Sequence, residues 1–144
     1  MKQINPLSDS VRAFFDAYEK ATNGFNIEII STLYAETFLF GTSQGAQAVK
    51  KDDFLKVLPK RSGFFSAIGL KSTELVSLEE TKLDDDYMMV RARWRMRYEK
   101  AGKEPIADES AATYVLFTRG HSLQIVMQID HQDLMKRVQE LGLM

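Results

Sequence analysis

Apolar and polar positions alternate most strictly between Tyr87 and Glu99, in the segment YMMVRARWRMRYE. Apolar side chains occupy every second position from Val90 to Tyr98, and an arginine lies at each position between them. Successive side chains of a strand point to opposite faces, so this segment predicts a strand with one apolar and one basic face. Such a strand is typical of the centre of an antiparallel sheet whose second face is solvated or paired with another subunit.

A helical pattern lies near the amino terminus. The apolar positions between Val11 and Ala21 follow the i, i+3, i+4, i+7 spacing of one helical face. Ser8 or Asp9 can cap this helix, which is expected to end near Asn23-Gly24.

Two further helices are predicted after the first. Asn26 can cap a short helix whose apolar face runs from Ile27 to Tyr34. A third helix is expected to start around Asp52 and to bend or stop at Pro59, because a proline ring does not fit a helix interior. The apolar side chains within 60–69 suggest that this segment folds back onto the core.

Strands separated by turn residues make up most of the remaining chain. They are expected at residues 37–41, 73–83, 87–99, 110–118 and 123–129. A polar loop at 42–45 follows the first strand, and the last four strands form an antiparallel meander. Asp130 can then cap a terminal helix that Gly142 closes.

This order of elements predicts an α+β domain, with helices packed on one face of a curved antiparallel sheet. Residues 1–144 are expected to form one such domain. A strongly curved sheet wrapped around the helices encloses a conical cavity, lined by the side chains that point inward. The candidates for this lining are Phe14, Tyr18, Phe38, Phe40, Phe54, Trp94, Met96, Tyr114, Ile125 and Met127.

The register of the last two strands leaves two choices for this lining. A two-residue turn at Gly120-His121 places Tyr114 in the cavity together with Ile125 and Met127. A turn that differs by one residue places the row that contains Thr113 there instead. Pairing of the apolar rows favours Tyr114.

Composition changes this picture mainly by exclusion. With 19 basic and 20 acidic residues, the formal net charge is −1, so neither nucleic acid nor an anionic membrane is an expected partner. The absence of cysteine removes disulfides and thiolate chemistry. The first residues lack a signal-peptide core, and no apolar run approaches the roughly 18 residues that span a bilayer, so a cytoplasmic location is expected.

No metal or cofactor is expected. The two histidines, His121 and His131, have no carboxylate cluster at ligand spacing nearby. The three aspartates at 84–86 lack the glycine and the glutamate of a calcium-binding loop. The sequence contains no phosphate loop, dinucleotide fingerprint or nucleophile elbow.

Two aromatic side chains are candidates for ligand contacts. Tyr18 can donate a hydrogen bond to a ligand, or bury its ring in the core with the hydroxyl at the edge. Trp94, the only tryptophan, can line the cavity or belong to the core. The arginines of 91–97 are expected to face outward. The glutamates available to pair with them are Glu79, Glu80 and Glu109.

Three segments carry a resemblance to a known family. The helix FFDAYEKATNG, the block IISTLYAETFLFG and the late segment QIDHQDLMKRVQELG resemble the nuclear transport factor 2-like, or cystatin-like, α+β superfamily. That superfamily includes ketosteroid isomerase, scytalone dehydratase and the SnoaL-type polyketide cyclases. The last two use pocket histidines or aspartates, for which this chain offers His121, His131 and Asp130.

The resemblance to ketosteroid isomerase implies an oxyanion donor, but the general base and the second oxyanion donor of that family have no acidic counterpart in this sequence. Tyr18 has the spacing of the family tyrosine that donates to the developing oxyanion. The family's general base is an aspartate that falls at Gly41-Thr42 here, and its second acidic donor falls near Thr113, which favours the Thr113 row in the cavity. A threonine hydroxyl cannot abstract a proton next to a carbonyl, so steroid isomerisation by the family mechanism is not expected.

Two hypotheses about function follow. In the first, the chain is a SnoaL-like or ketosteroid isomerase-like protein that binds a small hydrophobic or aromatic molecule, as an isomerase-, dehydratase- or cyclase-type enzyme without that base. Tyr18 is its polar contact, and Asp130 and His131 are further catalytic candidates. In the second, the chain is a non-catalytic interaction module whose cavity is filled by its own side chains. A homodimer through the outer sheet face is expected.

Overall fold

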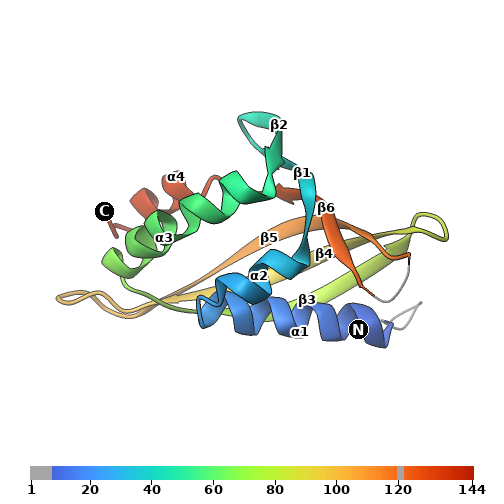
Figure 1. Cartoon of the computed structure of the whole chain (residues 1–144). Helices are drawn as coiled ribbons and strands as arrows, with labels where there is room; N and C mark the ends of the chain where they lie inside the picture. Colours follow the sequence, from blue (N-terminus) through green and yellow to red (C-terminus); the bar gives the residue numbers. More distant parts are fainter. Residues whose placement is uncertain (1–7, 120–121) are drawn as a thin grey trace.

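The computed structural model describes residues 8–119 and 122–144. The elements in chain order are α1 (Asp9–Asn23), α2 (Ile27–Leu33), β1 (Tyr34–Thr42), β2 (Gly45–Lys50), α3 (Lys51–Ala67), β3 (Leu70–Lys82), β4 (Tyr87–Tyr98), β5 (Ile106–Phe117), β6 (Gln124–Asp130) and α4 (Leu134–Glu140). Figure 1 shows α1, α2 and α3 lying over one face of a long, curved sheet. No helix among the described residues is both long and apolar enough to cross a membrane.

The six strands form one sheet in the order β2-β1-β6-β5-β4-β3. Strands β3 to β6 pair as the antiparallel meander that the turns predicted. Strand β1 lies parallel to β6 and antiparallel to β2. The predicted α+β class, with helices on a curved sheet, is therefore confirmed.

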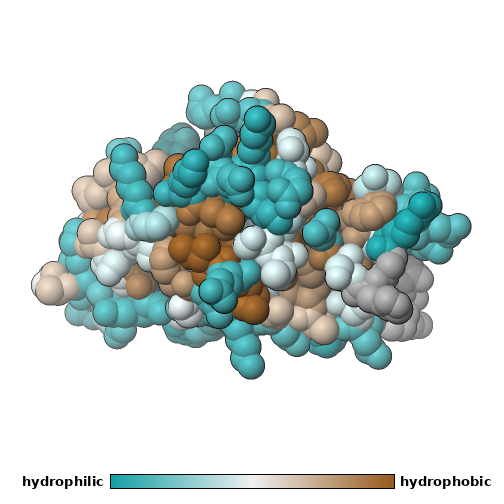
Figure 2. All heavy atoms as spheres, in the orientation of Figure 1, coloured by the Kyte–Doolittle hydropathy of each residue, from teal (hydrophilic) through white to brown (hydrophobic). Residues whose placement is uncertain are grey.

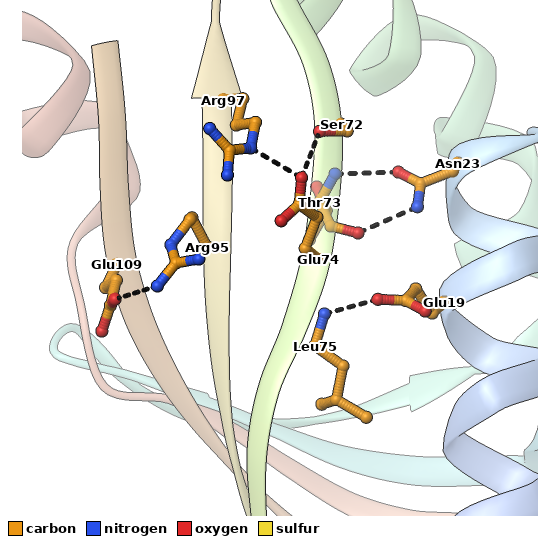
Figure 3. A network of polar contacts seen from close by, with 9 residues as sticks. All are labelled: Glu19, Asn23, Ser72, Thr73, Glu74, Leu75, Arg95, Arg97 and Glu109. Carbon is orange, nitrogen blue, oxygen red and sulfur yellow. Dashed lines mark hydrogen bonds and ion pairs between the residues drawn. The ribbon is translucent and has the colours of Figure 1, made fainter.

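The two faces of β4 differ as the alternation predicted. Val90 and Ala92 are fully buried, whereas the arginines lie on the outer face. Arg95 pairs there with Glu109 at 3.1 Å, and Arg97 pairs with Glu74 at 2.6 Å (Figure 3).

The expected pairing of the arginines with Glu79 and Glu80 is wrong. Glu80 lies opposite Val90, so the strand alternation directs it to the inner side, where it accepts hydrogen bonds from Ser8. Glu79 lies opposite Arg91, but the described residues show no ion pair between them.

The core divides into two clusters. The larger one joins α1 and α2 to the inner face of the sheet, with Phe15 and Leu116 fully buried. The smaller one joins the end of α3 to α4 and the start of β5. Its buried members are Ile68, Met96, Tyr98, Val138 and Leu143.

Helix α3 does not stop at Pro59, so of the two expected outcomes, a bend or a stop, the stop is wrong. It continues to Ala67, with Pro59 on its exposed side. A proline inside a helix costs about 3 kcal/mol. The turns beyond it place Phe64 and Phe65 against the smaller core cluster, and this burial offsets the loss.

Strand β2 follows the expected polar loop, in a segment for which the sequence predicted no element. It has exposed small and polar side chains, such as Ala46 and Gln47, so no apolar alternation identifies it. It pairs with β1 as a hairpin, from Thr37–Lys50 to Thr42–Gly45. Backbone hydrogen bonds, and not an apolar face, therefore define this strand.

Helix α1 protects the free edge of β3. The Asn23 side chain donates to the Thr73 carbonyl at 2.9 Å and accepts from its N–H at 2.8 Å. The Glu19 carboxylate accepts from the Leu75 N–H (Figure 3). An uncovered edge strand is a template for pairing with another chain, and these side chains occupy its backbone groups.

Replacing Asn23 with alanine is expected to lower the free energy of unfolding by about 1 kcal/mol and to increase self-association, because it uncovers this edge. Thermal unfolding and light scattering at rising protein concentration would measure the two effects. Lys20→Ala is a matched control, since Lys20 is exposed on the same helix. Equal behaviour of the two variants would contradict the edge-protecting role.

Candidate functional site

A cavity of about 330 Å³ lies between the helices and the inner face of the sheet. Figure 2 shows apolar side chains exposed on this side of the molecule, in the region between α3 and the turn from α1 to α2. The aromatic residues of its wall are Tyr18, Phe25, Tyr34, Phe40, Phe54, Phe65, Trp94 and Tyr114. Arg61, Lys71, Gln128, Asp130 and Gln132 are among its polar members.

A chain of hydrogen bonds follows the cavity wall. The Trp94 indole N–H donates to the Tyr114 hydroxyl at 3.2 Å, and that hydroxyl donates to Tyr18 at 3.5 Å. The Tyr34 hydroxyl donates to the Gln128 side-chain oxygen at 2.6 Å. The hydroxyl oxygens of Tyr18 and Tyr34 are 3.2 Å apart.

The number of protons on each hydroxyl determines which group donates in each of these hydrogen bonds. A tyrosine hydroxyl has one proton. Tyr34 gives its proton to Gln128, so it accepts from Tyr18. The Gln128 amide nitrogen donates in turn to an Asp130 carboxylate oxygen at 3.1 Å. All bonds therefore run from Trp94 towards a carboxylate, and bonds that run in one direction strengthen one another.

Burial makes the three tyrosines harder to ionise than an exposed tyrosine. It raises the pKa of Tyr18 above the ordinary 10.0, and it raises the pKa values of Tyr34 and Tyr114 well above that value. The negative charge of Asp130 acts in the same direction on the pKa of all three. Each hydroxyl is thus a hydrogen-bond donor at neutral pH.

Asp130 is the last residue of β6 and does not cap α4, contrary to expectation. The sheet ladder extends past it, because the His131 N–H still donates to the Ala111 carbonyl at 3.1 Å. The helix therefore starts later, and Asp133 caps it by accepting from the Lys136 N–H at 3.1 Å. This shift leaves the Asp130 carboxylate directed into the cavity.

His131 lies on the other side of the sheet. Its Nε2 is 2.6 Å from the Thr113 hydroxyl, beside a shallow outer depression that Arg93 and Glu109 also line. Ser110, Ala111 and Gln132 line both this depression and the cavity, so they lie between the two. His131 is not part of the cavity wall, and His121 lies outside the described residues.

The rim of the cavity carries a strained residue. Helix α1 ends at Asn23 as predicted, but Gly24 keeps a right-handed conformation and Phe25 takes a φ of 50°. A bulky residue with positive φ is uncommon and costs about 1–3 kcal/mol. Phe25 is 38% exposed and lines the cavity, so the strain is located at its rim.

Residues 8–133 match the family described as NTF2-like protein (DUF6841). The chain belongs to this family. No curated protein matches the sequence.

Solved structures share the fold at low sequence identity. Aln2 from a Streptomyces species has a TM-score of 0.72 and 12% identity, over 93% of this chain and 99% of that one. An NTF-2 like protein of unknown function from Shewanella oneidensis has a TM-score of 0.69 and 16% identity, over 86% and 98%. The beta subunit of benzoate 1,2-dioxygenase from Burkholderia mallei has a TM-score of 0.68 and 15% identity, over 94% and 95%.

The two acidic positions of ketosteroid isomerase have no counterpart in this NTF2-like cavity. Gly41 lies beside Ile129 on the outer side of the sheet, and Thr42 is exposed and does not line the cavity. Thr113 also faces outward, towards His131. Among the described residues that line the cavity, Asp130 is the single carboxylate.

Most of the expected lining residues are found in the cavity wall. Those that line it are Tyr18, Phe40, Phe54, Trp94, Met96 and Tyr114. Phe14, Phe38 and Ile125 point inward but are packed in the core cluster and do not line the cavity. Side chains thus fill one part of the space under the sheet and leave the other open.

Met127 was expected in the cavity and is not there. The ladder pairs Val115 with Met127 and then Leu116 with Ile125, so Val126 is an extra residue in a bulge. The bulge turns Met127 to the outer face and places Gln128 opposite Tyr114 on the inner one. The register question is thereby decided for Tyr114, which is buried.

Several polar wall residues were not predicted to line the cavity, among them Tyr34, Gln128 and Gln132. Tyr34 was assigned only to a helix face, and Gln128 and Gln132 were not considered. Gln128 interrupts the apolar pattern of β6, which is a usable signal. Nothing in the local sequence distinguishes Gln132 from a surface glutamine.

Proposed function

We propose that this NTF2-like protein binds a small, mainly apolar or aromatic molecule in the cavity. The observation that carries the proposal is an open space of about 330 Å³ that reaches a buried, one-directional hydrogen-bond chain. Binding sites for small molecules have volumes of about 300–1,000 Å³, apolar walls and a few placed polar groups. Side chains do not fill this space, which favours binding over a purely structural core.

Tyr18 is the proposed polar contact for the ligand. Its distances of 3.2 and 3.5 Å to Tyr34 and Tyr114 are long, since hydroxyl–hydroxyl hydrogen bonds centre on about 2.7–2.8 Å. Turning this hydroxyl towards a ligand oxygen therefore loses little. A carbonyl or phenol oxygen is the group that it would hold. Turnover of an isomerase, dehydratase or cyclase type would then need Asp130 as the proton acceptor, since it is the carboxylate of the described wall.

Emission from Trp94 tests the proposal, because this residue is the only tryptophan and lines the cavity. A panel of steroid-like, polyphenolic and terpenoid compounds would be titrated. We expect a saturable change with at least one of these classes, absent in Trp94→Phe and matched by a calorimetric Kd. No emission change and no heat with any compound would count against ligand binding.

Tyr18→Phe is expected to weaken binding of a carbonyl-bearing ligand about three- to tenfold, the value of one hydrogen bond. The affinity for the same molecule without its oxygen should not change. Calorimetry on both ligands with both proteins would measure this difference. An equal loss for the two ligands would mean that Tyr18 only shapes the cavity.

We also propose a homodimer through the outer sheet face, which would serve an interaction role as well as a binding one. On this face Leu39 is 44% exposed and lies opposite Met127, next to the partly exposed Ile129. The ion pairs Arg95–Glu109 and Arg97–Glu74 lie on the same face, further along β3, β4 and β5.

Leu39→Asp is expected to convert the dimer into a monomer, because it buries a charge in the proposed interface. Leu83→Asp is a matched control, since Leu83 is 51% exposed but lies beyond the end of β3. Sedimentation velocity at micromolar concentration would distinguish the two. A wild-type protein that sediments as a monomer would refute the dimer.

A further inference from the structure

We propose that Asp130 and Gln132 form a subsite of the cavity that binds a protonated amino group of the ligand. This inference rests on the proposed ligand binding and adds the chemical class of the molecule. Both residues line the cavity at the end of β6, on either side of the outward-facing His131.

Gln132 supplies the first reason. Its Oε1 is buried and has no hydrogen-bond partner, and it is the one side-chain atom of that kind in the described structure. Buried polar atoms of folded proteins are nearly always hydrogen-bonded. The residue lines both the cavity and the outer depression, and this oxygen is closed to solvent, so the side chain must turn for the oxygen to accept from a molecule bound in the cavity.

Asp130 supplies the second reason. One of its oxygens accepts the Gln128 amide proton, and none of the ion pairs within 8–119 and 122–144 involves it. A half-buried carboxylate is stabilised most by a charged donor. Asp130 and Gln132 together offer two acceptors. A hydroxyl group has one proton to donate, whereas an ammonium group has three and can satisfy both.

The surrounding wall is compatible with a cation. Trp94 and the tyrosines present aromatic rings, whose faces attract ammonium groups. Arg61 and Lys71 also line the cavity, but both are exposed, so water screens their charges. The charge of Asp130 raises the pKa of three wall tyrosines, whereas that of Arg61 lowers the pKa of Tyr18 alone among them. Of the charged side chains in the described wall, Asp130 is half-buried, whereas Arg61 and Lys71 are exposed.

Four naphthalenes that differ in one substituent test the subsite: 1-naphthylmethylamine, 1-naphthylmethanol, 1-methylnaphthalene and 1-naphthoic acid. Calorimetry at neutral pH would give the Kd of each. We expect the amine to bind about tenfold or more tightly than the methyl compound, and the acid to bind most weakly. Asp130→Asn and Gln132→Leu should each remove most of the preference for the amine over 1-methylnaphthalene.

The outcomes separate this inference from the proposed function. Equal binding of all four compounds, or tighter binding of the acid, would overturn the amine subsite while ligand binding stands. A preference for the amine that survives in both variants would also overturn it. Binding of none would overturn the subsite, and the Trp94 titration would then decide about the cavity itself.

The ligand-free protein gives a second measurement. If only a ligand satisfies the Gln132 oxygen, Gln132→Leu should leave the Tm unchanged or raise it, because an unpaired buried acceptor is removed. A clear fall in Tm would show that a trapped water or a neighbour uses this oxygen, and it would overturn the role in ligand recognition.

Discussion

Gly69→Ala is expected to lower the free energy of unfolding by about 3 kcal/mol, which corresponds to a fall in Tm of roughly 10 °C for a chain of this size. Gly69 joins α3 to β3 with a φ of +90°. A Cβ atom built there would lie 2.7 Å from the Glu99 carbonyl oxygen and 2.9 Å from its carbon. The neighbouring atoms are backbone and cannot move aside as a flexible side chain would.

The clash also breaks a specific contact. The Glu99 N–H donates to the Gly69 carbonyl at 2.7 Å, which fastens the end of β4 to the α3–β3 junction. Leu70 and Lys71, the next residues, line the cavity. We therefore expect ligand affinity to fall together with stability in this variant.

Two other glycines are matched controls for thermal unfolding. Gly102 has a φ of +82° with open space around its Cα, so Gly102→Ala should cost only the conformational strain, about 1 kcal/mol. Gly63 lies in α3 with open space, so Gly63→Ala should stabilise the protein by about 0.5–1 kcal/mol. A similar loss in Gly69→Ala and Gly102→Ala would contradict the clash.

Local patterns were sufficient to predict most of the fold. Alternation on β4 placed Trp94 inward and the arginines outward, because one buried face constrains every second residue. The first helix was found from Val11 to Ala21 for the same reason, with a period of 3.6. Both features depend on residues close in sequence.

The errors arise where tertiary contacts override local preference. Helix α3 passes Pro59 because its later turns are buried. The bulge at Val126 reverses the direction of Met127, and a bulge has no reliable sequence signal when its residues are all apolar. One extra residue was enough to move an expected wall residue to the outer face.

Cavity residues were predicted correctly only where the periodicity of their own helix or strand directs them towards the cavity. Tyr18, Trp94 and Tyr114 satisfied that condition and are hydrogen-bonded to one another. Tyr34 and Gln128 are 94 positions apart, and their bond depends on the parallel pairing of β1 with β6. No local pattern could reveal this partnership.

Tyr34→Phe is expected to lower the free energy of unfolding by about 2 kcal/mol, because the buried Gln128 oxygen loses its donor. The loss would also remove the acceptor for the Tyr18 proton. Tyr87→Phe is the matched control. The Tyr87 ring is 38% exposed and its hydroxyl makes no hydrogen bond to the described residues, so a change within about 0.5 kcal/mol is expected.

The pH dependence of Tm gives a second measure of the same residue. Burial raises the pKa of Tyr34 well above 10.0, so above that pH the unfolded chain releases a proton that the folded protein keeps. Because the unfolded state then carries fewer protons than the folded state, the free energy of unfolding falls as pH rises above 10. Below pH 10 both states keep the Tyr34 proton, so the stability of the folded protein is not reduced by this residue. Tyr34→Phe removes one such group, so its Tm should fall less steeply than that of the wild type above pH 10. Parallel curves for the two proteins would show that Tyr34 ionises as freely when folded as when unfolded, and that the hydrogen-bond chain is not closed to water.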